Sequence, residues 1–85
     1  MADAALVEKF TQGAALTLET DASHLTRETH LKQDLNISSI KRFMLMADME
    51  ELFKVKVFYA QVNKCVTFGD VLDLIDTLSA KKALA

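Results

Sequence analysis

Two adjacent serines have the clearest chemical potential in this chain. Ser38 and Ser39 stand at the start of a stretch whose apolar spacing predicts a helix running to about Phe53. Serine is a favoured N-cap, and the free N–H groups and the dipole at a helix start stabilise a bound anion. Lys41 and Arg42 add positive charge close by. A phosphodiester on a serine hydroxyl would therefore be stabilised here, although both serines could also serve only as caps.

The remaining reactive side chains indicate no catalytic residue and no metal site. Cys65 is the only cysteine, so an internal disulfide is excluded, which suits a reducing cytoplasm. His24 and His30 lack a cluster of Cys, His or carboxylate residues at metal-ligand spacing, and we interpret both as surface residues. Ser39 with either histidine could suggest a hydrolase, but no third orienting group and no oxyanion loop is evident.

Length and composition predict one folded domain over residues 1–85. The chain is 51% hydrophobic and contains no proline, whereas disordered chains are poorer in apolar residues. A net charge of -2 provides no basic field for nucleic acid or an anionic membrane. No apolar run approaches the ~20 residues that span a bilayer, and the first residues do not resemble a signal peptide. We expect a cytoplasmic protein that acts as a monomer.

Apolar spacing predicts an all-α fold with four helices. Leu6, Phe10 and Ala14 form the stripe of a first helix, for which Asp3 is a suitable N-cap. A short helical turn is expected near residues 60–64, after the helix that follows the two serines. The last helix should open at Thr67, close to a capping box with Asp70, and its stripe comprises Phe68, Val71, Leu72, Ile75 and Leu78.

Two connections complete the predicted fold. Residues 17–37 have poor periodicity and form a long first loop, which apolar residues should pin onto the core: Leu25, Leu31, Leu35 and Ile37. Residues 54–59 alternate like a strand, but no second convincing strand exists to pair with them. We therefore expect an extended connector with Val55 and Val57 directed inward.

The helix after the serines has apolar side chains on two opposite sides. At about 100° per residue, one stripe comprises Leu45, Met46, Met49, Leu52 and Phe53, and the other comprises Ile40, Phe43, Met44 and Ala47. A surface helix needs one apolar stripe, and a domain of this size can hardly bury a helix on every side. We expect the first stripe to face the core and the second to meet a ligand or partner, unless both pack between other helices.

The segment around the serines resembles the attachment motif of acyl carrier proteins. That motif is usually Asp-Leu-Gly-x-Asp-Ser-Leu, and the segment here reads Asp34-Leu35-Asn36-Ile37-Ser38-Ser39-Ile40. The resemblance extends without gaps from about Leu31 to Ile75 and includes the family's buried positions in the second helix. Cys65 falls at a core position of the family, which implies a buried structural cysteine.

The resemblance implies a four-helix bundle of acyl-carrier type with a long first loop and a short third helix. In this family a phosphopantetheinyl transferase attaches 4′-phosphopantetheine from coenzyme A to the motif serine, which maps to Ser39, with Ser38 as the weaker alternative. The thiol of the arm then presents acyl groups as thioesters to acyl-transferring and chain-elongating enzymes of fatty-acid, polyketide or related biosynthesis. Partner-binding positions map to Ile40, Lys41, Phe43, Met44, Ala47 and Asp48.

Three departures from the family pattern qualify this assignment. Ser38 replaces the usual Asp, Asn36 replaces the usual Gly, and the helix start is basic where the family is normally acidic. Partner enzymes of the family commonly present a basic patch, and like charges across an interface disfavour binding. We therefore infer a specialised pathway and not housekeeping fatty-acid synthesis. The altered motif also leaves open an unmodified carrier-like domain that acts as a protein-binding module.

Overall fold

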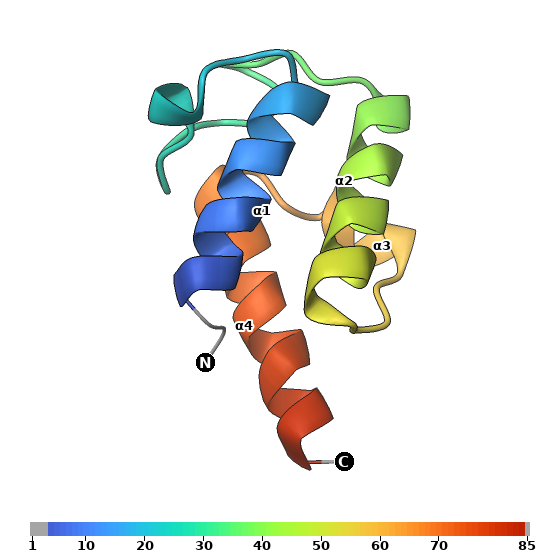
Figure 1. Ribbon diagram of the computed structural model, residues 1–85. Helices are drawn as coiled ribbons and strands as arrows, with labels where there is room; N and C mark the ends of the chain where they lie inside the picture. The colour runs from blue at the N-terminus through green and yellow to red at the C-terminus, as the bar shows by residue number, and fades with distance from the viewer. Residues whose placement is uncertain (1–3, 85) are drawn as a thin grey trace.

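The computed structural model describes residues 4–84, with side chains to residue 81. This part of the chain contains five helical segments. They are α1 (Ala4–Thr17), the 3-10 turn η1 (Ala22–His24), α2 (Ser39–Phe53), α3 (Tyr59–Asn63) and α4 (Phe68–Leu84). The described residues contain no strand, only one isolated bridge between His30 and Thr67. The predicted all-α bundle with a long first loop and a short third helix is confirmed (Figure 1). The predicted cap at Asp3 lies outside the described residues.

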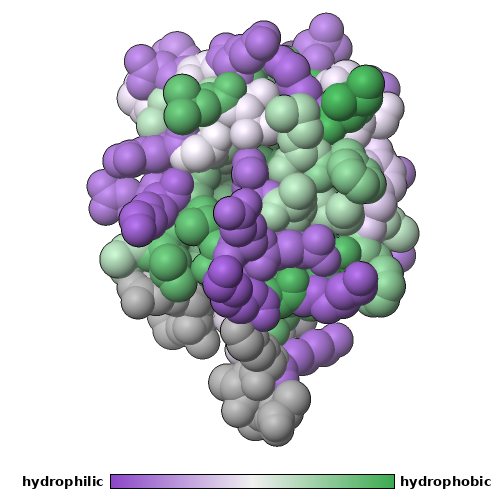
Figure 2. All heavy atoms as spheres, turned by 45° about the vertical axis from the view of Figure 1, so that its right-hand side comes forward, coloured by the Kyte–Doolittle hydropathy of each residue, from purple (hydrophilic) through white to green (hydrophobic). Residues whose placement is uncertain are grey.

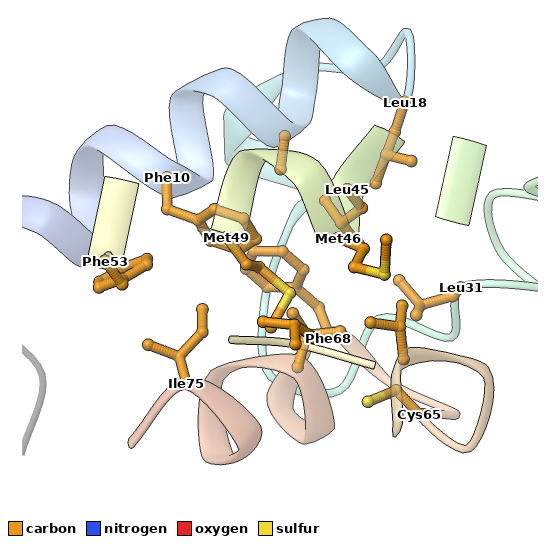
Figure 3. Packing of buried hydrophobic residues seen from close by; sticks show 14 of the residues in the cluster. Phe10, Leu18, Leu31, Leu45, Met46, Met49, Phe53, Cys65, Phe68 and Ile75 are labelled. Atoms are coloured by element: carbon orange, nitrogen blue, oxygen red, sulfur yellow. The ribbon is translucent and has the colours of Figure 1, made fainter. Parts of the chain in front are cut away.

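The core forms where the apolar stripes of α1, α2 and α4 meet (Figure 3). The ring of Phe10 packs edge-on against Phe53 of α2, with centroids 5.9 Å apart, and stacks on Phe68 of α4 at 6.0 Å. Met49 and Ile75 are fully buried beside these rings. Aromatic side chains bury more area than any others, so these three rings join the three long helices.

The long loop between α1 and α2 is fixed to the start of α4 by backbone hydrogen bonds. The amide of Phe68 donates to the Thr29 carbonyl at 2.9 Å, and the amide of Gly69 donates to the Arg27 carbonyl at 3.1 Å. Arg27 also forms an ion pair with Asp73 of α4 at 2.8 Å. The apolar residues predicted to pin this loop onto the core do so: Leu25 and Leu31 are buried, and Leu35 and Ile37 are partly buried against the core.

The connector between α2 and α3 is extended, as expected. Lys54 ends α2 in the left-handed region at φ 55°. Val55 and Val57 are then buried, and the Val57 amide donates to the Glu50 carboxylate at 3.0 Å. A side-chain acceptor thus replaces the second strand that this alternating segment lacks.

The start of α4 carries the reciprocal cap that its sequence predicts. The Asp70 amide donates to the Thr67 hydroxyl at 3.1 Å, and the Thr67 amide donates to the Asp70 carboxylate at 3.1 Å. The Val66 amide donates to the same carboxylate at 2.9 Å. The hydrogen bond from the Val66 amide is the larger of two backbone effects that hold the pKa of Asp70 below its ordinary value, and the bond from the Thr67 amide is the other.

Among the described helices, none combines the length and the apolar character that a membrane-spanning helix needs.

The contact between the loop and α4 gives a first prediction, for the two glycines. A Cβ at Gly69 would lie 2.7 Å from the Arg27 carbonyl oxygen, which is backbone and cannot easily move away, whereas nothing lies within 4 Å of a Cβ at Gly13. We expect Gly69→Ala to lower the free energy of unfolding by about 1–3 kcal/mol. Gly13→Ala should raise it by about 0.5–1 kcal/mol, because alanine is the better helix former. Urea unfolding followed by circular dichroism measures both, and a Gly69→Ala protein as stable as the wild type would contradict the close approach.

Candidate functional site

The two serines of the candidate site have different roles. Ser38 is the N-cap of α2, and its hydroxyl accepts a hydrogen bond from the Lys41 amide at 3.2 Å. Ser39 is the first residue of the helix and is exposed. Within residues 4–81, no group forms a hydrogen bond with the Ser39 hydroxyl. Of the two hydroxyls, only that of Ser38 is engaged in a hydrogen bond within the described residues.

Two residues that depart from the family motif, Asn36 and Ser38, suit the backbone conformation at their positions. Asn36 has φ 51°, in the left-handed region that favours glycine. Asn is among the few other residues that tolerate this region, so it can replace the usual Gly. Ser38 replaces an Asp, and both residue types are strong N-caps. The altered sequence thus still turns the chain and starts α2 at Ser39.

A small polar pocket of about 330 Å³ lies beside Ser39. Ser39 itself lines it, together with residues of the long loop, α2 and α3: Lys32, Ile37, Arg42, Tyr59 and Asn63. Lys32 and Arg42 give the pocket positive charge, and the helix dipole of α2 adds to it. An anion attached to the Ser39 oxygen would find favourable electrostatics on this side.

Arg42 has a structural role that the sequence did not reveal. One terminal nitrogen of its guanidinium donates to the carbonyls of Val62 and Cys65, each at 3.1 Å. These carbonyls lie at the end of α3 and just after it, where helical hydrogen bonding ends. The Val62 carbonyl also accepts from the Cys65 amide at 3.0 Å, and Arg42 adds a charged donor to both carbonyls. The Arg42 guanidinium, which the sequence analysis assigned to an anion site, therefore also links α2 to the end of α3 by hydrogen bonds.

The two apolar stripes predicted for α2 face opposite environments. Leu45, Met46, Met49 and Phe53 are buried, and Leu52 is partly buried. The other stripe is in solvent: Ile40 is 73% exposed, Phe43 56% and Met44 47%, and Ala47 is exposed as well. In Figure 2, which brings α2 forward, green and pale-green side chains gather over this helix. We call Ile40, Phe43, Met44 and Ala47 the apolar face of α2.

Two predicted partner-binding residues, Lys41 and Asp48, lie at the border of this face and contact α1 or the residues after it. The Lys41 ammonium pairs with Glu19 at 3.0 Å, and the Asp48 carboxylate accepts a hydrogen bond from Thr17 at 2.9 Å. On the opposite border the face continues onto α3, where the Tyr59 ring lies 6.2 Å from that of Phe43. The sequence analysis did not include Tyr59 among the residues that border this face. Its position just after the inward-facing Val55 and Val57 could have indicated that it lies close to α2.

The other candidate residues form no second site. Cys65 is 6% exposed and its thiol lies 3.5 Å from the Gln61 carbonyl oxygen. Burial raises the pKa of Cys65 to about 11, and the nearby carboxylate of Asp70 acts in the same direction. His24 is exposed and His30 is partly buried. Among the described residues, no three His, Cys, Asp or Glu side chains are grouped as metal ligands would be.

A small helical bundle with a free serine hydroxyl at the start of its second helix, and an apolar helix face beside it, defines a carrier-type domain. No model of a known protein family matches the chain. The chain is 30% identical over 66 residues to the acyl carrier protein of an Exiguobacterium species, which covers 78% of this chain and 84% of that relative. It is 37% identical over 59 residues to the acyl carrier protein of Thermotoga maritima, covering 69% of this chain and 73% of the relative.

The match to the acyl carrier protein of Phytoplasma mali is similar, at 31% identity over 70 residues, or 82% of this chain and 83% of the relative. The chain therefore belongs to the acyl carrier protein family. It is a carrier protein and not an enzyme, so the hydrolase interpretation is rejected.

The position of Arg42 leads to a prediction about stability. Arg42→Met removes both hydrogen bonds to the end of α3 and leaves those carbonyls without this donor. We expect the free energy of unfolding to fall by about 1–3 kcal/mol, because hydrogen bonds to a charged donor are among the stronger ones. Lys41→Met is the matched control, since its ion pair with the exposed Glu19 should contribute no more than about 1 kcal/mol. Equal effects of the two substitutions in urea unfolding would contradict a structural role specific to Arg42.

The raised pKa of Cys65 yields a third prediction, about thiol reactivity. Only the thiolate reacts with iodoacetamide, and a shift from 9.0 to about 11 lowers the thiolate fraction near pH 8 by about 100-fold. The folded chain should therefore be alkylated at least about 100-fold more slowly than the urea-unfolded chain. Its rate should rise as the pH approaches the raised pKa. Mass spectrometry of timed samples measures this, and equal rates in both states would show that Cys65 is accessible.

Proposed function

We propose that this carrier holds acyl groups as thioesters on a 4′-phosphopantetheine arm attached to Ser39. A phosphopantetheinyl transferase attaches the arm, and acyl-transferring and chain-elongating enzymes of a fatty-acid, polyketide or related pathway use it. The observation that carries the proposal is the difference between the two serines. The hydroxyl of Ser38 is engaged as a cap, whereas that of Ser39 is exposed at the positive end of α2.

The residues around Ser39 fit such an arm. Its phosphodiester is an anion, and it would lie beside the first N–H groups of α2 and the pocket that Lys32 and Arg42 line. Arg42 cannot swing away from this place easily, because two carbonyls hold its guanidinium. When bound, the arm supplies a thiol that forms thioesters. The chain's own residues only hold the attachment point rigid and exposed, and they fix the direction in which the arm leaves α2.

Partner enzymes would approach Ser39 along α2 and contact Ile40, Phe43, Met44 and Ala47, with Lys41 and Asp48 at the border. The basic start of α2 supports a specialised pathway, whose enzymes do not rely on an acidic helix. The buried free thiol of Cys65 is compatible with a monomer acting in the cytoplasm.

Mass spectrometry after coexpression with a broad-specificity phosphopantetheinyl transferase tests the attachment site. We expect the wild-type chain to gain the mass of one phosphopantetheine, and Ser39→Ala to gain nothing. Ser38→Ala is the matched control: it should still be modified, while losing about 1 kcal/mol of stability with its cap. Modification that survives Ser39→Ala would reject the assignment. An unmodified wild-type chain whose partner binding is insensitive to Ser39→Ala would instead favour the unmodified binding module.

A further inference from the structure

Two neighbouring cavities form one groove that begins at Ser39. The cavity of about 330 Å³ beside Ser39 shares Lys32, Arg42 and Asn63 with a second cavity of about 290 Å³, so the two adjoin. The second cavity continues past these residues to the segment after α3, where Val66 lines it. We call the two cavities together the Ser39 groove. It leads from the proposed attachment point, between the long loop and the end of α3, to the segment before α4.

Hydrogen bonds hold both walls of the Ser39 groove in place. The long loop provides one wall: His30, Lys32 and Gln33. The Leu31 amide in this wall donates to the Val66 carbonyl at 3.0 Å. The opposite wall is the end of α3, which Arg42 links to α2 through two carbonyls at 3.1 Å. Because neither wall has to be ordered when a ligand enters, a few contacts are enough to hold a ligand there.

The lining of the groove is rich in hydrogen-bond donors. The two carbonyls use one terminal nitrogen of Arg42, whereas its Nε and its other terminal nitrogen have no partner in the described part of the chain. The Lys32 ammonium and the side-chain amides of Gln33 and Asn63 have no partner there either. No Asp or Glu among the described residues lines either cavity. A ligand with acceptor oxygens therefore finds several donors, two of them charged.

Two carboxylates lie near the outer end of the groove without lining it. Asp34 accepts from a backbone amide of the long loop at 2.8 Å, and Asp70 accepts from a backbone amide before α4 at 2.9 Å. Both carboxylates are ionised at neutral pH and disfavour an anion at that end. An anionic group is therefore favoured only in the part that the two cavities share, which Lys32 and Arg42 line.

The interior next to the groove is filled by side chains. Leu31, Leu45 and Val62 are 0% exposed, and Cys65 is 6% exposed. Figure 3 shows Leu31 and Cys65 at one end of this packed cluster. An alkyl chain could enter the core only by displacing such side chains, because protein interiors are close-packed. The groove needs no such displacement, since residues such as Asn63 that line it are already exposed.

We propose that the Ser39 groove binds the acyl group carried on the arm and selects acyl groups with acceptor oxygens, carbonyl or carboxylate, beyond the thioester. This inference rests on the proposed carrier function and specifies its cargo. The oxygens accept hydrogen bonds from Arg42, Gln33 and Asn63. A plain alkyl group in the same place would take water from these donors and give them no partner, which is unfavourable.

A weak site is sufficient for this selection. Because the acyl group is tethered to Ser39 at one end of the groove, its effective concentration there is on the order of millimolar. A site with an intrinsic Kd of about 1 mM is then half occupied. The few hydrogen bonds that the groove offers are in keeping with such an affinity.

Three acyl groups of equal carbon number test the selection. A broad-specificity phosphopantetheinyl transferase loads the isotope-labelled chain from butyryl, acetoacetyl or succinyl coenzyme A, and nuclear magnetic resonance spectra compare each product with the chain that carries the bare arm. We expect the side-chain amide signals of Gln33 and Asn63 to shift with the acetoacetyl and succinyl groups but not with butyryl, which lacks the additional oxygens. Comparison of the first two separates a neutral carbonyl from a carboxylate.

Substitutions in the lining test whether the shifts come from the groove. Gln33→Ala and Asn63→Ala should each reduce the shift of the other amide, and both side chains are exposed, so the fold should be kept. Gln12→Ala is the matched control, because it removes an exposed amide on α1 that lines neither cavity. It should leave the shifts unchanged.

Other results of the same experiment would overturn the proposal. Equal shifts with all three acyl groups would show that the groove does not select oxygens. Shifts of Leu31, Leu45 and Val62 in place of the groove amides would put the oxygen-bearing cargo in the core, and spectra identical to that of the bare arm would show no bound cargo. A chain that mass spectrometry finds unmodified before any spectrum is recorded would instead reject the carrier function, and this proposal with it.

Discussion

The interior stripe of α2 is the constraint on which the other features depend. Leu45, Met49 and Phe53 are buried against α1 and α4, and this packing fixes the rotation of the helix about its axis. Because apolar residues also occupy the opposite side, the same rotation places Ile40, Phe43 and Met44 in water. A bundle of 85 residues has too few helices to cover both sides. The exposed face is thus a direct result of how the core is packed.

The beginning of α2 shows how a motif can change while its geometry is kept. The chain needs a left-handed residue, a cap and an exposed hydroxyl in sequence, and Asn36, Ser38 and Ser39 supply them in that order. Each replacement is among the few residue types that meet the same physical requirement. A comparison by residue identity alone would count Asn36, Ser38 and Ile40 as mismatches, although Asn36 adopts a left-handed conformation and Ser38 caps α2.

Much of the fold could be predicted from the sequence because it rests on local signals. Periodicity located the helices, the reciprocal Thr67–Asp70 cap located the start of α4, and the two stripes of α2 were assigned to the correct sides. The partners of Lys41 and Arg42 could not be predicted, because they lie about twenty residues away along the chain. Only the folded arrangement of α1, α2 and α3 brings those groups together. The 3-10 turn in the long loop was likewise missed, since Asp21 caps it within a polar segment that shows no periodicity.

The burial of Cys65 has a consequence for any thioester that the domain carries. Thioesters exchange readily with a thiolate, so a reactive cysteine on the same surface would draw the acyl group off the arm and onto the protein. Here the one cysteine thiol is enclosed between α3 and the start of α4 and stays protonated at neutral pH. A thioester on an arm at Ser39 would therefore not exchange onto Cys65 while the domain stays folded.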